Sequence, residues 1–165
     1  MWNKKIIKYL CGAIITIILL IVIYTLCNTF SVGSKEKILE FYTTYEKEII
    51  SVSKYITDLP YENVYLPNSD VKKDNIYLNI TDTKNESKQI IITDGQIRES
   101  IFTLVNSGKL EVILKTNGNI YFQKWSNLKY GRGILYSING EVPQNELLIK
   151  LEPLDENGWY FYEEE

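Results

Sequence analysis

An unbroken apolar run near the N-terminus constrains the fold of this chain more than any other feature of its sequence. Residues 9–27 contain no charged side chain, and as an α-helix they would extend over roughly 28 Å, close to the ~30 Å hydrocarbon core of a bilayer. Residues 13–23 carry apolar side chains on every face, whereas a surface helix of a water-soluble domain keeps a polar face. Residues 6–27 are therefore predicted to form a transmembrane helix in contact with the lipid bilayer. The predicted span includes Ile6, Ile14, Leu20 and Cys27.

A cleaved signal peptide is the main alternative for this run. The run is longer than the ~7–15 apolar residues of a signal-peptide core, and no small-x-small cleavage site follows it cleanly. Residues 28–34 offer only a weak site, and a buried core helix would normally contain a polar interruption. The sequence therefore favours a retained signal-anchor helix in a single-pass membrane protein.

The charges on either side of the run predict its orientation. Lys4, Lys5 and Lys8 precede the apolar core, whereas all 21 acidic residues follow it. Short lysine-rich ends remain in the cytoplasm, according to the positive-inside rule. Residues 1–5 are thus expected to be cytoplasmic, and everything after the span is expected on the outer side of the cell membrane.

The composition excludes several classes of chemistry for the extracytoplasmic part. The chain has no histidine, and both of its cysteines, Cys11 and Cys27, lie within or at the edge of the apolar run. Disulfides, cysteine chemistry and the usual zinc and nucleophilic-triad sites are therefore not expected there. The net acidity and the lack of a basic stripe argue against nucleic acid as a partner. Abundant Ile, Lys, Asn and Tyr with only two arginines are typical of an AT-rich bacterial genome.

The residues after the span predict a hinge and a long amphipathic helix. Residues 28–34 contain Asn, Ser and Gly and are interpreted as a hinge, and Ser34 is a suitable N-cap for a helix over 35–56. Apolar residues recur there at alternating spacings of four and three, which predicts one buried stripe. The stripe packs either on the domain's own sheet, which we favour, or on a second copy of the chain. The homo-oligomer would form through Ile38, Tyr42, Tyr45, Ile49 and Val52.

The remaining sequence predicts mainly antiparallel strands. Residues 61–74 are polar and are expected to be mostly loop, and alternating apolar residues predict strands at 75–81 and 88–93. A second helix is expected at 95–106, followed by a β-meander of about five strands with Asn-Gly turns at 117–118, 139–140 and 157–158. The predicted fold is a single α+β domain at 35–165, with two helices packed on a mainly antiparallel sheet.

Two features of the predicted meander are candidates for recognition of a partner. Arg132 lies between Gly131 and Gly133 in an expected hairpin loop, where its guanidinium could meet an anionic group. By alternation, several aromatic side chains point away from the helices and would form an amphipathic surface for a protein partner. The candidate partner surface consists of Tyr121, Trp125, Arg132, Tyr160 and Tyr162.

The order of a short basic N-terminus, an apolar helix and a helix leading into an antiparallel sheet resembles that of type IV pilin-like proteins. Those proteins carry Glu at the fifth position after their processing site, whereas the fifth residue after Gly12 is Ile17.

The sequence thus favours a non-enzymatic, protein-binding or accessory module without a cofactor. The alternative is a structural subunit of a self-associating secretion or pilin-like assembly. A carboxylate-dependent hydrolase is least favoured, because the carboxylates occur at spacings typical of a solvated surface.

Overall fold

The computed structural model describes residues 14–20, 34–81, 86–127 and 129–165. Residues 14–20 are helical and their large apolar side chains are exposed, from 52% at Ile14 to 63% at Ile15. Within the described ranges, none of the helices combines the length and the apolar character needed to cross a membrane. Most of the predicted span, including Ile6 and Cys27, and hinge residues 28–33 lie outside the described residues.

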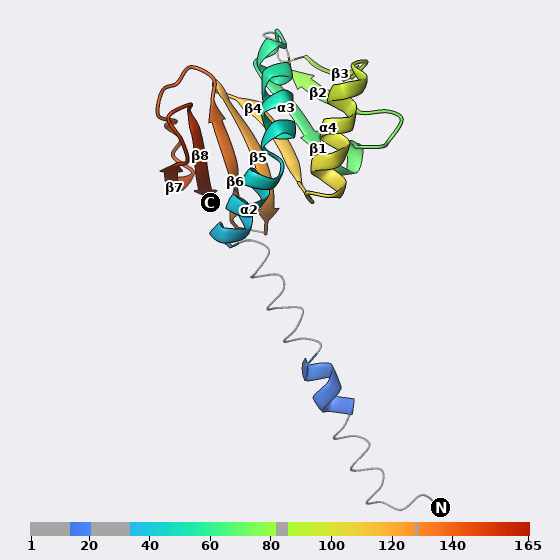
Figure 1. The fold of residues 1–165 in the computed structure, drawn as a ribbon, viewed down its shortest axis with the longest axis vertical. Helices are drawn as coiled ribbons and strands as arrows, with labels where there is room; N and C mark the ends of the chain where they lie inside the picture. The colour runs from blue at the N-terminus through green and yellow to red at the C-terminus, as the bar shows by residue number, and fades with distance from the viewer. Residues whose placement is uncertain (1–13, 21–33, 82–85, 128) are drawn as a thin grey trace, which may run out of the picture.

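The rest of the described chain is an α+β domain, which confirms the predicted fold class at this level. Eight antiparallel strands form one sheet in the order β3-β2-β1-β4-β5-β6-β8-β7, and Figure 1 shows the three helices on one face of it. The helices are α2 (Lys35–Thr44), α3 (Glu46–Asp58) and α4 (Gly95–Asn106). The strands are β1 (Asn63–Pro67), β2 (Tyr77–Thr81), β3 (Ser87–Ile91), β4 (Val112–Thr116), β5 (Asn119–Ser126), β6 (Gly131–Ser137), β7 (Leu148–Pro153) and β8 (Trp159–Glu164), and a 3₁₀ turn, η1 (Asn68–Asp70), follows β1.

The single helix predicted at 35–56 is in fact two helices. Tyr45 leaves the helical conformation (φ −116°, ψ 23°) and separates α2 from α3. The break allows α2 to pack on β6 and β8 while α3 packs beside α4. The apolar spacing continues through Tyr45 without a glycine or proline, so the sequence contains no local signal for the break.

The apolar stripe of these two helices packs on the domain's own sheet, the first of the two predicted alternatives. Ile38, Tyr42, Ile49 and Val52 are all buried in the helix-side core, and Tyr45 packs against it while remaining partly exposed. Burial of this kind contributes about 1.5–3 kcal/mol for each large aliphatic side chain. The surface expected to join two copies is therefore largely occupied within one chain.

The prediction of a loop over 61–74 missed a central strand. β1 pairs with β2 on one side and with β4 on the other. Only Val64 and Leu66 supply its buried alternation, and Pro60 and Pro67 bound it closely. Two buried positions between prolines are too few to identify a strand from alternation. In the folded domain, β1 nevertheless joins the two halves of the sheet.

The C-terminal strands depart from a simple meander. β4, β5 and β6 are neighbours in sequence order, but β8 pairs with β6 and leaves β7 at the edge. Gly118 (φ 72°) and Gly158 (φ 85°) close hairpins as predicted, whereas Asn139-Gly140 opens a long connection to β7. Gly131, Arg132 and Gly133 lie within β6 and not in a hairpin loop.

Two buried lysines donate hydrogen bonds to backbone carbonyls on the helix side of the sheet. The ammonium group of Lys115 donates to the carbonyl oxygens of Ile56 (3.0 Å) and Leu59 (2.9 Å) at the end of α3. Lys124 donates to the carbonyls of Gly108 and Lys109 beyond α4. The last carbonyls of a helix lack partners inside it and carry partial negative charge, so Lys115 both satisfies and neutralises the end of α3. Lys124 instead satisfies two carbonyls of the segment that follows α4.

Candidate functional site

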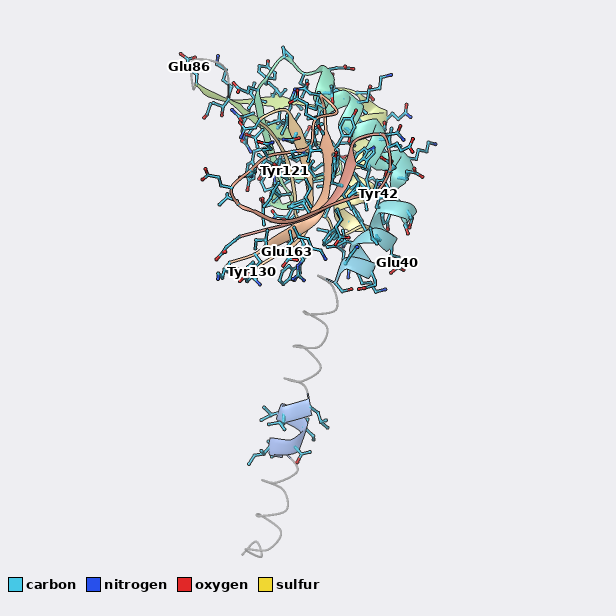
Figure 2. The ribbon with its side chains drawn as sticks, turned by 90° about the vertical axis from the view of Figure 1, so that its left-hand side faces the viewer. Glu40, Tyr42, Glu86, Tyr121, Tyr130 and Glu163 are labelled. Atoms are coloured by element: carbon cyan, nitrogen blue, oxygen red, sulfur yellow. The ribbon has the colours of Figure 1, made fainter. Side chains whose placement is uncertain are left out.

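The side of the sheet that faces away from the helices, here called the open face, carries the most distinctive surface of the domain. Strand register aligns one row of its side chains across the sheet. Figure 2 shows Tyr121 of this row on the side opposite Tyr42, which lies among the helices. The row consists of Gln89, Asn79, Tyr65, Leu114, Tyr121, Leu135 and Tyr160.

Two hollows lie along this row and share Leu114. The first, the β3 hollow, has a volume of about 370 Å³ and lies over β1, β2 and β3 between Tyr65 and Gln89. The second, the loop hollow, has a volume of about 490 Å³ and lies between β4, β5 and the ends of β6 and β8. Asn145 and Leu147, from the connection that precedes β7, form one wall of the loop hollow. Leu114 thus stands on a ridge between two concave surfaces.

The half of the open face nearest β3 exposes large apolar side chains. Tyr65 is 45% exposed, Tyr77 40% and Ile91 46%. Tyr77 and Ile91 are directly opposite each other on β2 and β3. Exposed aromatic and aliphatic side chains on one face of a sheet are a common mark of an interaction surface.

The structure brings together part of the predicted aromatic surface but buries it. Tyr121 and Tyr162 meet edge to face with 5.3 Å between ring centroids, and they are only 4% and 0% exposed. With Leu135 they form a small second core on the open face, and the half-buried Tyr160 packs against it. The alternation rule assigned these side chains to the correct face but could not foresee their burial.

Trp125 and Arg132 form a separate pair. A β-bulge between Gln123 and Trp125 shifts the register of β5 against β6, so that Trp125 lies opposite Arg132. The guanidinium lies 5.3 Å from the indole ring and its Nη2 is 2.8 Å from Glu163 Oε1. Neither side chain belongs to the Tyr121–Tyr162 cluster.

Two glycines of β6 allow close approaches: Gly131 leaves room for polar side chains in the loop hollow, and Gly133 allows the backbone of β5 to come near. A Cβ at Gly131 would lie 2.4 Å from Gln123 Nε2 and 3.0 Å from Glu164 Oε1. The Gln123 carboxamide from β5 and the Glu164 carboxyl from β8 therefore both occupy space beside Gly131, where β6 has no side chain. At Gly133 a Cβ would lie 2.1 Å from the carbonyl oxygen of Phe122. The Gly-x-Gly pattern was visible in the sequence, but its role was not.

Burial alters the ionisation of the groups around this hollow. Desolvation raises the pKa of the Glu164 carboxyl above its ordinary range. Burial, and then the nearby Glu164 charge, raises the pKa of the Tyr162 phenol, and its hydroxyl has no hydrogen-bond partner among the described residues. Burial also raises the pKa of Tyr121, while a hydrogen bond from Asn145 opposes the shift.

The charges at the mouth of the loop hollow are paired. Lys129 Nζ lies 2.8 Å from Glu165 Oε1, and Figure 2 shows Tyr130 and Glu163 at the same end of the domain. The walls consist mainly of carboxamides, phenols and aliphatic groups. No group of three acidic or cysteine side chains suited to a metal ion occurs within the described ranges. The chemistry of this surface suits recognition by hydrogen bonds and apolar contact.

Comparison with protein families, with curated proteins and with solved structures finds no match for this chain. Its function is therefore inferred from its own residues.

Proposed function

We propose that this chain is a single-pass membrane protein whose domain at 35–165 lies outside the cytoplasm and binds another protein through the open face of its sheet. The uncharged stretch at 9–27 and the preceding Lys4, Lys5 and Lys8 support the anchor and its orientation. The exposed apolar side chains of helical residues 14–20 fit a lipid environment.

The position of Leu114 on the ridge between the two hollows carries the proposal for the binding face. The row from Gln89 through Tyr65 and Leu114 to Tyr121 crosses five neighbouring strands, or roughly 19 Å at ~4.8 Å per strand. All of these side chains are uncharged. An uncharged centre that is rich in aromatic groups is typical of the buried core of a protein interface. A surface of this breadth exceeds what a small ligand covers, so the expected occupant is a protein.

The loop hollow provides an anchoring point within that surface. Gln123 and Glu164 line this hollow, and both lie against the space that a side chain at Gly131 would fill. A partner with one polar side chain beside an apolar patch would satisfy these groups on docking. Such desolvated pockets commonly supply most of the binding free energy.

Site-specific photo-crosslinking in the native membrane tests the binding face. The full chain would carry a benzophenone amino acid at Tyr65 or Tyr77, and the control would carry it at Lys47, which is exposed on α3. We expect a discrete cross-linked product at Tyr65 and Tyr77 but none at Lys47. A product from Lys47 alone would contradict the proposal, and a product with twice the mass of the chain would favour the self-associating assembly.

Cysteine labelling in intact cells tests the orientation. In a chain lacking Cys11 and Cys27, Ser69→Cys on the exposed η1 turn is expected to react with a membrane-impermeant maleimide. Asn3→Cys is expected to react only after the membrane is permeabilised. The reverse pattern, or equal labelling of both before permeabilisation, would overturn the predicted topology.

A further inference from the structure

A third cavity, here called the helix-side pocket, lies on the face of the sheet opposite the open face. It has a volume of about 390 Å³ and lies between the exposed flank of α3 and the ends of β6 and β8. α3 contributes residues spaced by about one turn, which places them on one side of the helix. Its lining includes Tyr42, Glu46, Lys54, Asp58, Tyr136 and Trp159.

Three aromatic rings form the inner wall of this pocket. The rings of Tyr136 and Trp159 lie 4.7 Å apart at an interplanar angle of 33°, and Tyr42 lies 5.5 Å from Trp159. Trp159 is buried, Tyr136 is half-buried, and the exposed Ile50 contributes an apolar rim. Aromatic faces carry negative electrostatic potential and attract cations, with Trp the most effective of the three types.

The charged residues around the pocket leave it net negative. Glu46 and Asp58 are exposed on α3, Asp155 lies on the β7–β8 turn, and Lys54 is the one cation among the lining residues. Asp155 also has a structural role, because its Oδ1 accepts from the backbone of Asn157 at 2.8 Å. Glu46 and Asp58 are therefore the carboxylates best placed to act on a ligand.

Two hydroxyl groups add hydrogen-bonding capacity to the wall. The Tyr42 hydroxyl donates to Asp155 Oδ2 at 3.3 Å, and burial followed by the Asp155 charge raises its pKa, so it remains neutral. The Oγ1 atom of Thr57, another lining residue, is buried and has no hydrogen-bond partner among the described residues. A ligand that carries a hydroxyl group could satisfy it after a small side-chain rotation.

We infer that the helix-side pocket binds a small organic cation: an ammonium group held against Trp159 and Tyr136, with Glu46 and Asp58 compensating its charge. The aromatic wall and the net negative rim disfavour anions. The cavity is separate from the open face, so this site functions whether or not the proposed protein partner binds there.

Choline is a suitable probe because its neutral isostere, 3,3-dimethyl-1-butanol, has nearly the same shape. Titration of the full chain in a maltoside detergent, followed by the NMR signal of the Trp159 indole, is expected to give a dissociation constant of about 1 mM for choline, a usual strength for so small a ligand. The isostere is expected to bind at least about tenfold more weakly, as a lost charge contribution of about 1.4 kcal/mol implies. Phosphocholine should also bind more weakly than choline, because the carboxylates repel its phosphate. Tighter binding of phosphocholine, or equal binding of the isostere, would overturn the inference.

Matched substitutions on α3 locate the site. Asp58→Asn and Glu46→Gln are expected to weaken choline binding about three- to tenfold each, whereas Lys54→Gln is expected to strengthen it by a similar factor. Lys47→Gln, on a part of α3 that does not line the pocket, serves as the control and should leave the affinity unchanged. Because all four positions are exposed, none of these variants should unfold the domain. No change with Asp58→Asn and Glu46→Gln, or no change with Lys54→Gln, would contradict a cation in this pocket.

Discussion

The two faces of the sheet are built from different side chains and are covered in different ways. On the helix side, β2, β4 and β5 contribute aliphatic residues such as Leu78, Ile113 and Ile120, which are fully buried beneath three helices. On the open face the same strands contribute Asn79, Leu114 and Tyr121, and part of this surface remains exposed. Strand alternation thus separates a face that is fully covered by helices from one that is only partly buried.

The largest expected difference in the free energy of unfolding is between substitution of a core residue on one face and of an exposed residue on the other. Ile101→Ala removes a fully buried side chain of α4 and is expected to lower the free energy of unfolding by about 3–4 kcal/mol. Tyr65→Ala on the open face should lower it by less than about 1 kcal/mol. Urea denaturation of both variants measures the difference. Similar losses would mean that the open face contributes to stability as much as the helix face, and the comparison would fail.

The next largest loss of stability is expected at Gly133, where the absence of a side chain allows β5 and β6 to lie close together. Gly133→Ala would place a methyl group 2.1 Å from the carbonyl oxygen of Phe122, and separating the strands should cost about 2–3 kcal/mol. Gly95→Ala, at the start of α4, is the control because the nearest neighbour of its Cβ is the end of the Arg98 side chain at 3.9 Å. Thermal melting should show a large loss for Gly133→Ala and little change for Gly95→Ala. Equal melting temperatures would show that β6 can move away from β5 without a loss of stability.

Substitution of the buried Lys115, whose ammonium group lies at the end of α3, tests how the helix side accommodates a charge. Lys115→Met keeps most of the side-chain volume but leaves the carbonyls of Ile56, Thr57 and Leu59 without their shared donor. Burial lowers the pKa of Lys115, so part of the gain from capping is offset by desolvation of its charge. We expect a net loss of about 1–2 kcal/mol in chemical denaturation. Lys47→Met, which changes an exposed lysine, should have no measurable effect; a stability gain for Lys115→Met would indicate that desolvation dominates.

The sequence predicted the helix side of this molecule better than the open face, for a physical reason. The helix-side stripe, the bounds of α4 and the hairpin turns at Gly118 and Gly158 depend on local spacing and backbone conformation, which a sequence displays directly. β1 was missed because a strand of five residues with two buried positions depends on its neighbours for its identity. The break at Tyr45 is likewise a consequence of tertiary packing.

The candidate site was predictable only in part. Alternation assigned Tyr121, Tyr160 and Tyr162 to the face away from the helices, but the bulge after Gln123 placed Trp125 opposite Arg132. The loop hollow depends on the connection before β7 and on the position of β8 beside β6, and neither can be derived from periodicity. Gln123, Gly131 and Glu164 lie on three different strands. Their proximity can be predicted only when the strand order is known.

The smallest expected change in stability is that of Glu164→Gln. Its sign tests whether the loop hollow is a recognition surface or part of the structural core. Because burial raises its pKa, the folded protein holds this proton more tightly than the unfolded chain, and ionised Glu164 costs stability at neutral pH. Glu164→Gln should therefore be slightly more stable than the unmodified protein at pH 7, by less than about 1 kcal/mol after allowance for solvent screening. The advantage should disappear as the pH falls through the raised pKa toward the ordinary value, where both states become protonated.

Glu152 on the neighbouring edge strand provides the control with the opposite sign. Hydrogen bonds from Lys150 and then Lys35 lower its pKa, so its contribution to stability is present at neutral pH and is lost as the pH falls through the lowered value. Thermal melting of Glu164→Gln and Glu152→Gln between pH 4 and pH 7 should thus give shifts of opposite direction at pH 7. A destabilised Glu164→Gln at pH 7 would mean that the carboxylate stabilises the fold, and the loop hollow would then be part of the structural core. A stabilised variant would mark Glu164 as a residue that costs the fold stability, as functional residues commonly do.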